Sequence, residues 1–124
     1  MKIYVGHSRS GDFKRDLYDP IRKYLNQYDI VLPHENDEET FQGRDFYKNI
    51  DLFIAEVSSR ATGLGIELGY ASDDGTPIYC IYRKGTKYSR SLENITDNFY
   101  EYRDVEEMIK IMREVIKERE NELQ

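Results

Sequence analysis

The residues that point most clearly to chemistry lie between positions 58 and 71. The segment Ser58-Ser59-Arg60-Ala61-Thr62-Gly63-Leu64-Gly65 follows an apolar run and leads into the helix-like stretch Ile66-Glu67-Leu68-Gly69-Tyr70-Ala71. Glycines at a turn from strand to helix permit close backbone approach, and amides at a helix N-terminus suit a phosphate or another electron-rich group. On a helical wheel Glu67 falls within the arc that faces apolar surroundings. A carboxylate there loses solvent and needs a partner or a ligand.

Spacing alone leaves two interpretations of Glu67 open. In the first, the carboxylate complements the helix dipole or accepts hydrogen bonds from amides of the first turn, which is a modest stabilising role. In the second, it acts on a ligand held at the adjoining loop. A choice between them depends on the elements that position the segment.

Those elements alternate between strand-like and helix-like patterns, as is typical of an α/β domain with a parallel sheet. We expect one domain over residues 1–124, built on a doubly wound, five-stranded parallel sheet of flavodoxin-like, Rossmann-like order. The run 51–57 is nearly continuous in apolar character, which predicts a central strand. The expected strands are 2–5, 29–32, 51–57, 77–82 and 98–102, and the expected helices are 13–25, 36–49, 64–72 and 105–123. The first helix is expected to break or kink near Asp19, because Pro20 interrupts its apolar spacing.

In sheets of this kind, ligands bind outside the carboxyl ends of the strands, where the strand order reverses. Three loops follow the first three predicted strands, at residues 6–11, 33–39 and 58–65. The loop before Glu67 is one of them. We therefore expect the functional site where these three loops meet.

Composition limits the classes of ligand. The 124 residues include 18 Lys and Arg against 24 Asp and Glu, a net charge of −6. This acidity argues against binding polymeric nucleic acid or an anionic membrane, both of which require a basic face. No apolar run approaches the roughly 20 residues of a membrane span, and the chain opens on a strand-like segment, so we expect a cytoplasmic protein. The single Cys80 with only His7 and His34 is too small a set for a structural zinc site, and Cys80 is expected to be a core thiol.

Two blocks of sequence carry a family resemblance. Phe53-Ile54-Ala55-Glu56-Val57, followed by Thr62-Gly63-Leu64-Gly65-Ile66-Glu67-Leu68-Gly69-Tyr70-Ala71, resembles the nucleoside 2-deoxyribosyltransferase superfamily, which includes the 2'-deoxynucleoside 5'-monophosphate N-hydrolases. The similarity extends from Tyr4 through 32–35 and 77–83 to 89–94. It implies an enzyme that cleaves or transfers the N-glycosidic bond of a 2'-deoxynucleoside or its 5'-monophosphate, without a cofactor or a metal.

The resemblance also implies catalytic roles for three residues. Glu67 matches the nucleophile that attacks the anomeric carbon in a retaining mechanism, a task that suits a carboxylate beside an oxocarbenium-like transition state. Tyr4 matches a tyrosine that hydrogen-bonds the nucleophile or the sugar; its alternative is a core aromatic. Asp45 matches an aspartate that binds the sugar hydroxyl and assists the departing base, although the interval 46–50 is shorter than the family's. Its alternative is an exposed helix residue.

Substrate-binding residues are implied in the same way. Gly6, Ser8 and Arg9 belong to a loop that resembles the family's Gly- and Ser-rich loop, with the arginine shifted by one place, and hydroxyls, amides and a guanidinium can cradle a phosphate. His34 matches a loop histidine near the base; its alternative is a solvated histidine. In the third loop, Ala61 replaces a family serine and Thr62 offers a hydroxyl beside it. The remaining predicted contacts are Gly63, Gly65 and Ser89.

Ser89 bears on substrate and assembly. It matches a serine that in the monophosphate hydrolases reaches the phosphate in a neighbouring subunit's site, so the resemblance implies a homodimer with composite active sites. With Lys87 and Arg90 nearby, this favours a phosphorylated substrate.

Two other functions stay open. A nucleotide sensor without turnover would explain the departures at Asp45 and Ala61. A flavodoxin-like protein would use the segment 8–12 to hold a flavin phosphate, but it leaves Glu67 without a task. A response regulator is disfavoured, because no acidic pair for magnesium follows the first strand.

Overall fold

The computed structural model describes residues 1–36 and 43–124, which form a parallel five-stranded sheet with helices on both faces. The strand order is β2-β1-β3-β4-β5, so the predicted doubly wound, flavodoxin-like fold is confirmed. In chain order the elements are β1 (Lys2–His7), η1 (Lys14–Tyr18), α1 (Asp19–Tyr24), β2 (Asp29–Val31), η2 (Arg44–Asn49), β3 (Leu52–Glu56), α2 (Thr62–Asp73), β4 (Ile78–Arg83), η3 (Arg90–Asn94), β5 (Phe99–Tyr102) and α3 (Val105–Glu122).

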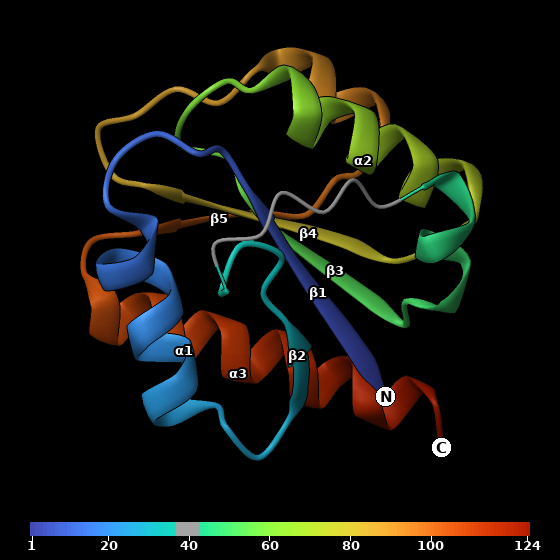
Figure 1. Ribbon diagram of the computed structural model, residues 1–124, viewed down its shortest axis with the longest axis horizontal. Coiled ribbons are helices and arrows are strands. Elements are labelled where there is room, and N and C mark those ends of the chain that lie inside the picture. The colour runs from blue at the N-terminus through green and yellow to red at the C-terminus, as the bar shows by residue number, and fades with distance from the viewer. Residues whose placement is uncertain (37–42) are drawn as a thin grey trace.

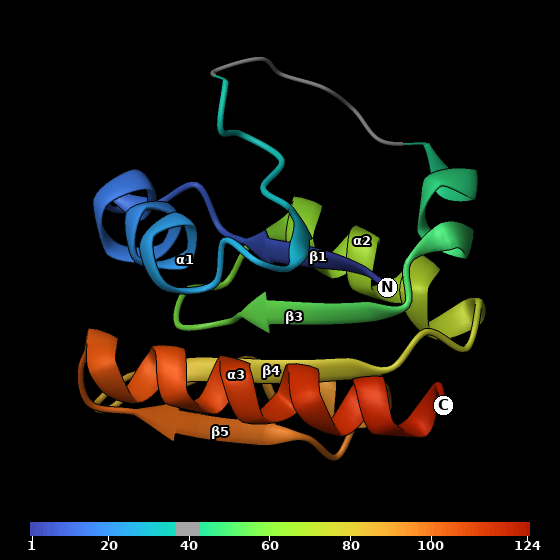
Figure 2. The same cartoon turned by 90° about the horizontal axis from the view of Figure 1, so that it is seen from below.

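Alternation along the strands divides the core between the two faces of the sheet. On β1, Ile3 and Val5 pack in the cluster that contains residues of α1 and α3, whereas Tyr4 packs in the cluster beneath α2. Tyr4 stands opposite Phe53 of β3 in the parallel register. Figure 1 shows the three layers, with α2 above the sheet and α1 and α3 below it. Figure 2 looks onto the α1 and α3 side and shows the strands in order.

Helix α2 positions Glu67 through its apolar stripe. Leu64, Leu68 and Ala71 are buried against the sheet, at a spacing that keeps them on one side of the helix. The helix begins at Thr62, two residues before the predicted start. Gly63 and Gly65 therefore lie in its first turns and not in the preceding loop.

One other helical prediction is confirmed and one is corrected. The helix predicted over 13–25, broken or kinked near Asp19, is a short π-helix, η1, followed by α1, which begins at Asp19 with Pro20 near its first position. Proline is tolerated there because its missing amide would be unpaired in any case. In the segment expected as helix 36–49, the described part is the 3₁₀ helix η2, and residues 37–42 lie outside the described residues.

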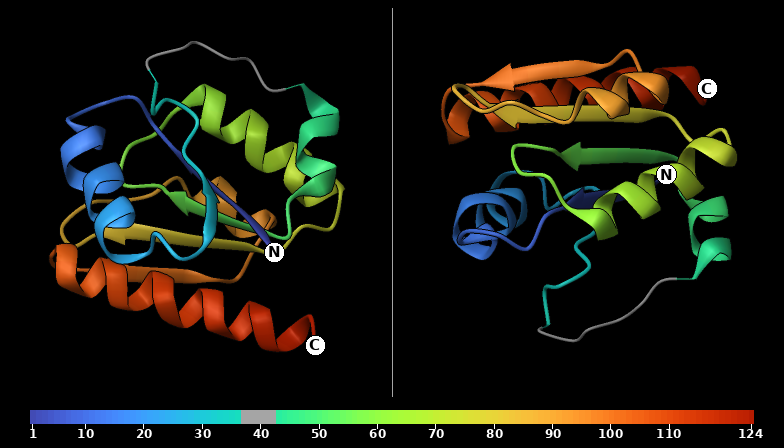
Figure 3. Two further views of the ribbon diagram at one scale, coloured as in Figure 1. Left: turned by 60° about the horizontal axis from the view of Figure 1, so that its bottom comes forward. Right: turned by 90° about the horizontal axis from the view of Figure 1, so that it is seen from above.

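The described parts of the three predicted loops, residues 6–11, 33–36 and 58–65, meet at the carboxyl edge of the sheet, whereas both chain ends lie at the opposite edge, as Figure 3 shows. No helix within 1–36 and 43–124 is long and apolar enough to cross a membrane. The edge that carries the loops is where the cavities are found.

Candidate active site

A cavity of about 370 Å³ opens beside Glu67 at the carboxyl edge of the sheet. Its wall combines the end of β1, the loop after β2, helix η2 and the beginning of α2. These elements are distant in sequence and meet at the point where the strand order reverses between β1 and β3. The lining residues are Tyr4, His7, Ser8, Arg9, Pro33, His34, Tyr47, Ala61, Gly63, Leu64, Ile66, Glu67 and Tyr70.

Two tyrosine hydroxyls converge on one oxygen of Glu67. Tyr4 donates a hydrogen bond to Oε2 of Glu67, and Tyr47 donates to the same oxygen at 2.8 Å. Within the described residues, Oε1 of Glu67 accepts no hydrogen bond. The carboxylate is therefore held through one oxygen, while the other is left to interact with a molecule in the cavity.

Burial fixes the protonation of the two tyrosines. Both side chains are about 1% exposed. Burial raises the pKa of the Tyr4 hydroxyl far above its ordinary value, and the nearby Glu67 carboxylate raises it further. Burial and the hydrogen bond to Glu67 raise the pKa of Tyr47 in the same direction. Both hydroxyls therefore keep their protons at neutral pH and act as donors to the carboxylate.

Close packing brings β1 and α2 together at this point. A Cβ atom added to Gly6 would lie 2.7 Å from Cε1 of Phe53 and 2.8 Å from Cδ1 of Leu64, so this position has no room for a side chain. Gly6 was predicted as a substrate contact, but the structure gives it a packing task and it does not line the cavity. It lets Leu64 approach β1, and Leu64 is one turn before Glu67.

A second hydrogen-bond chain supports the other wall of the cavity. Nδ1 of His7 donates to the carbonyl of Ser8 at 2.6 Å, which leaves Nε2 to accept from the hydroxyl of Tyr18. The Tyr18 oxygen accepts from the backbone amide of His34 at 3.1 Å. Burial lowers the pKa of His7 and raises that of Tyr18 to about 12, so both are neutral at physiological pH. Tyr18 thus joins the end of β1 to the loop after β2.

The predicted binding residues divide between two cavities. Ser8, Arg9, His34 and Gly63 line the cavity of Glu67, as does Tyr4. Thr62, Gly65 and Ser89 instead line a neighbouring cavity of about 460 Å³ between α2 and η3. Ala61 and Leu64 border both cavities. Within one chain, the start of α2 separates Ser89 from Glu67.

Asp45 is not brought into either cavity. Its side chain is 88% exposed and pairs with Lys48 at 3.0 Å, one turn along η2. In a 3₁₀ helix, side chains three residues apart eclipse one another, so Asp45 and Lys48 share the outer side of η2. The structure therefore places Asp45 as the exposed helix residue that was its alternative interpretation.

Sequence reasoning missed Tyr47, Tyr18 and Tyr70. Tyr47 is buried in an aromatic cluster with Tyr4, Phe53 and Tyr70, at ring-centroid distances of 5.5, 6.3 and 6.0 Å from it. One signal was available. An aromatic residue placed three residues before the apolar Ile50 is consistent with an inward-facing stripe on a helix.

A third, polar cavity of about 190 Å³ lies across His7, toward the end of β5. Glu56 lines it and accepts hydrogen bonds on both oxygens: from the Ser58 amide at 2.6 Å to Oε1, and from the Tyr102 hydroxyl to Oε2. In the described part of the chain, no three His, Cys, Asp or Glu side chains gather as a metal site would require.

Comparisons with known proteins agree with this architecture. No protein-family model matches the chain. The chain is 29% identical over 102 residues to "Putative 2'-deoxynucleoside 5'-phosphate N-hydrolase 1" of Syntrophotalea carbinolica, covering 70% of this chain and 72% of that protein. It also has the fold of the Clostridium botulinum CMP N-glycosidase BcmB, with 21% identity, a TM-score of 0.63, and coverage of 91% of this chain and 99% of that one. The predicted resemblance to a superfamily that includes the 2'-deoxynucleoside 5'-monophosphate N-hydrolases is confirmed by the first of these proteins, and the second agrees with it in fold.

Proposed function

We propose that this chain hydrolyses the N-glycosidic bond of a 2'-deoxynucleoside 5'-monophosphate, with Glu67 as the nucleophile. The observation that carries this proposal is the position of Glu67 in a cavity, with both tyrosine donors on Oε2. The structural alternative, in which the carboxylate caps amides of its own helix, has no support, because both its partners are side chains from other elements. The name of the Syntrophotalea relative supports hydrolysis and a phosphorylated deoxynucleoside.

In the first step, Oε1 of Glu67 bonds to the anomeric carbon as the bond from that carbon to the base nitrogen breaks. The electron pair of the broken bond goes to the base nitrogen, which is protonated from solvent or from a polar group of the cavity. The negative carboxylate stabilises the oxocarbenium-like transition state before it captures the sugar. The product of this step is a free base and a sugar esterified to Glu67.

In the second step, a water oxygen bonds to the anomeric carbon as the ester bond to Oε1 breaks. The electron pair returns to the carboxylate, and the proton of the water passes to solvent. Two displacements at one carbon retain its configuration. Tyr4 holds the carboxylate in position throughout, because its hydroxyl remains a donor.

The loop after β1 supplies groups suited to the 5'-phosphate. Ser8 and Arg9 line the cavity of Glu67, and the Ser8 hydroxyl lies 2.6 Å from that of Ser10. A guanidinium and hydroxyls together favour a phosphate over a neutral sugar hydroxyl. His34, from the loop after β2, lines the same cavity, and its ring is suited to contact the base.

The proposal includes a homodimer with composite sites. Ser89 lines a cavity on the far side of the start of α2, so it would reach a phosphate only in the site of a second copy. Sedimentation at the assay concentration tests this point, and a strictly monomeric active protein would remove the role of Ser89.

Product analysis tests the reaction. Purified protein is incubated with deoxynucleosides, deoxynucleoside monophosphates and ribonucleoside monophosphates, with and without a second free base, and the products are separated by chromatography. We expect release of base from the deoxynucleoside monophosphates. A new nucleoside in the presence of the second base would show transfer in place of hydrolysis.

The matched variant is Glu67→Gln, which keeps the shape of the side chain and removes its charge. Loss of base release in this variant supports the nucleophile assignment. Binding of a monophosphate without any turnover by the wild type would instead favour the sensor, and a yellow protein as purified would favour the flavin-binding alternative.

A further inference from the structure

We infer that Tyr47 is a second positioning residue for Glu67, one that η2 supplies and that acts on both steps of the proposed reaction. This inference rests on the proposed function and deepens it. Nothing in the family resemblance assigns a task to Tyr47; the assignment comes from the geometry of η2 and the site.

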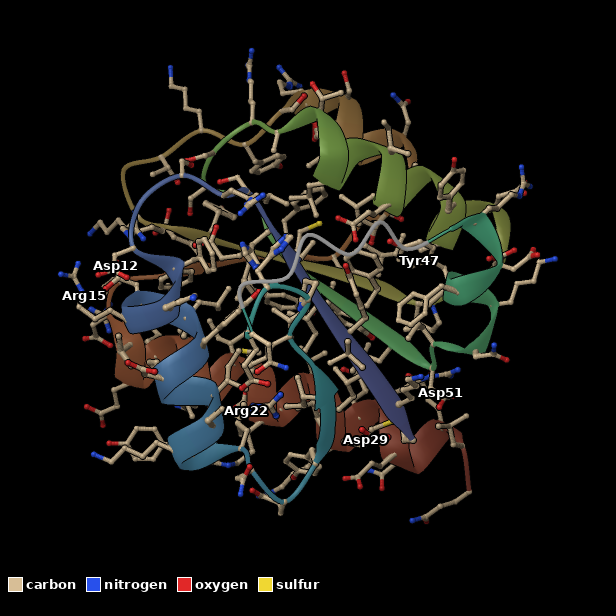
Figure 4. The ribbon with its side chains drawn as sticks, in the orientation of Figure 1. Asp12, Arg15, Arg22, Asp29, Tyr47 and Asp51 are labelled. Carbon is tan, nitrogen blue, oxygen red and sulfur yellow. The ribbon has the colours of Figure 1, made fainter. Side chains whose placement is uncertain are left out.

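The register of η2 selects Tyr47 in place of Asp45. Side chains of a 3₁₀ helix eclipse at every third residue, so Asp45 and Lys48 share one side of η2 and Tyr47 lies on another. Tyr47 is 1% exposed and Ile50 is 5% exposed, whereas the Asp45 side chain is 88% exposed. Figure 4 shows Tyr47 on the inner side of η2. The short interval before β3 thus presents an aromatic hydroxyl to the site and turns the carboxylate outward.

The ring of Tyr47 is held rigidly, so its hydroxyl has a defined direction. It packs edge-on against Tyr4 and Phe46, at centroid distances of 5.5 and 5.2 Å, and is stacked with Phe53 at 6.3 Å. The hydroxyl lies 2.8 Å from Oε2 of Glu67, within the normal range for a hydrogen bond between oxygens. Preorganised donors of this kind cost no reorganisation during the reaction.

Two hydrogen-bond donors on Oε2 fix the orientation of the Glu67 carboxylate, which a single donor would not do. A single hydrogen bond permits the carboxylate to rotate about its terminal bond, whereas bonds from Tyr4 and Tyr47, which come from different elements, fix the plane of the group. Oε1 is then directed into the cavity. When the sugar is esterified to Oε1, the charge on Oε2 falls; when water releases the sugar, the charge returns to the carboxylate, and both hydroxyls stabilise it.

The test compares Tyr47→Phe with Tyr102→Phe. Each substitution removes one hydroxyl that donates to a glutamate, but Tyr102 donates to Glu56, outside the cavity of Glu67. We expect Tyr47→Phe to lower kcat by roughly 10- to 100-fold, the effect of losing one hydrogen bond to a charged group. We expect Tyr102→Phe to keep kcat near the wild-type value.

The split between kcat and KM separates positioning from structural support. Tyr47 donates to the Glu67 carboxylate, so loss of its hydroxyl should lower kcat and kcat/KM by similar factors and leave KM within a few-fold of the wild-type value. Melting temperature and near-ultraviolet circular dichroism establish that the variant is folded. A role in folding alone would leave kcat unchanged for the molecules that remain folded.

The possible results are distinguishable. If the wild type releases base and Glu67→Gln does not, the proposed function stands; a folded Tyr47→Phe with wild-type kcat then overturns the inference about Tyr47 alone. If Glu67→Gln is as active as the wild type, the proposed function fails and the inference fails with it. Asp45→Asn, measured in parallel, should reduce kcat less than Tyr47→Phe, and the reverse order would contradict the inference.

Discussion

Two glutamates of this chain accept hydrogen bonds from buried tyrosine hydroxyls, and they differ in how their oxygens are used. Glu56 at the end of β3 accepts on both oxygens, from the Ser58 amide and from Tyr102. Glu67 on α2 accepts two tyrosine hydroxyls on Oε2. Glu56 therefore ties the end of β3 to β5 and to its own following loop, whereas Glu67, which lines a cavity, is held through one oxygen. Both residues are glutamates that accept from a tyrosine hydroxyl, so the distribution of hydrogen bonds over the two oxygens distinguishes a structural carboxylate from a candidate nucleophile.

The largest expected difference between the regions of Glu67 and Glu56 is the loss of activity when Glu67 is substituted. Glu67→Gln should lower kcat/KM by at least about a thousandfold, because loss of a nucleophile removes most of the transition-state stabilisation. Its melting temperature should remain close to that of the wild type, since the amide oxygen still accepts the tyrosine hydrogen bonds. Base release by chromatography and thermal unfolding check both parts. Activity within a few-fold of the wild type would remove the distinction between the two glutamates.

Glu56→Gln should lower the stability of the protein and leave its activity unchanged, the reverse of Glu67→Gln. The amide nitrogen cannot accept, so one of the two hydrogen bonds made to Glu56 is lost, and a hydrogen bond to a charged group contributes about 1.5 to 3 kcal/mol. We expect the free energy of unfolding to fall by roughly that amount, with kcat for the folded protein preserved. Urea unfolding and assays below the midpoint measure the two quantities. A loss of kcat without a loss of stability would place Glu56 in the reaction.

Gly6→Ala should affect both stability and activity, because Gly6 packs where β1 supports the Glu67 side of the molecule. The new methyl group would meet Phe53 and Leu64, and overpacking of this kind costs about 1 to 3 kcal/mol. Displacement of Leu64 would also move the start of α2, so kcat should fall as well.

The matched control for that substitution is Gly69→Ala, whose Cβ would meet nothing within 4 Å. In a helix interior, alanine is more favourable than glycine by up to about 1 kcal/mol, so this variant should be slightly more stable than the wild type. Equal destabilisation by both substitutions would contradict the packing account.

The smallest effect concerns His7, which lines both the cavity of Glu67 and the cavity of Glu56. Burial lowers its pKa, and this outweighs the opposing effects of the Ser8 carbonyl and Glu56. In the unfolded chain His7 binds a proton near pH 6.5, and in the folded chain it binds that proton at lower pH. The contribution of His7 to the free energy of unfolding is therefore complete above pH 6.5 and declines as the pH falls below it. We expect the stability of the wild type to fall more between pH 7.5 and about pH 5 than that of His7→Gln. Parallel curves would show that His7 does not titrate as inferred.

Much of the architecture could be predicted from the sequence because apolar periodicity reports burial. The alternating runs predicted the five strands and their order, and the helical arc around Glu67 predicted a carboxylate that needs a partner. The predicted hydrogen bond from Tyr4 to Glu67 is present, although it rested on the family resemblance. Patterns that depend on regular elements were therefore informative.

Sequence patterns were less informative about the irregular elements, where the position of each side chain depends on the exact register of the element. Tyr47 and Asp45 are two residues apart and point to different sides in an α-helix and in the observed 3₁₀ helix alike, so helical periodicity does not tell which of them faces the site. The link from Tyr18 to His7 and His34 joins three elements through single hydrogen bonds, and no spacing in the sequence indicates it. The split of Thr62, Gly65 and Ser89 from the cavity of Glu67 depends on where α2 begins.

Direct detection of the sugar on Glu67 tests the central claim. Wild-type protein in excess over a deoxynucleoside monophosphate is quenched in acid at a series of times and digested, and the peptides are sequenced by mass spectrometry. The account predicts that the peptide with Glu67 carries the mass of the esterified sugar phosphate, with that mass localised to the Glu67 side chain. Base release at every quench time with the sugar on another residue, or on none, would contradict it.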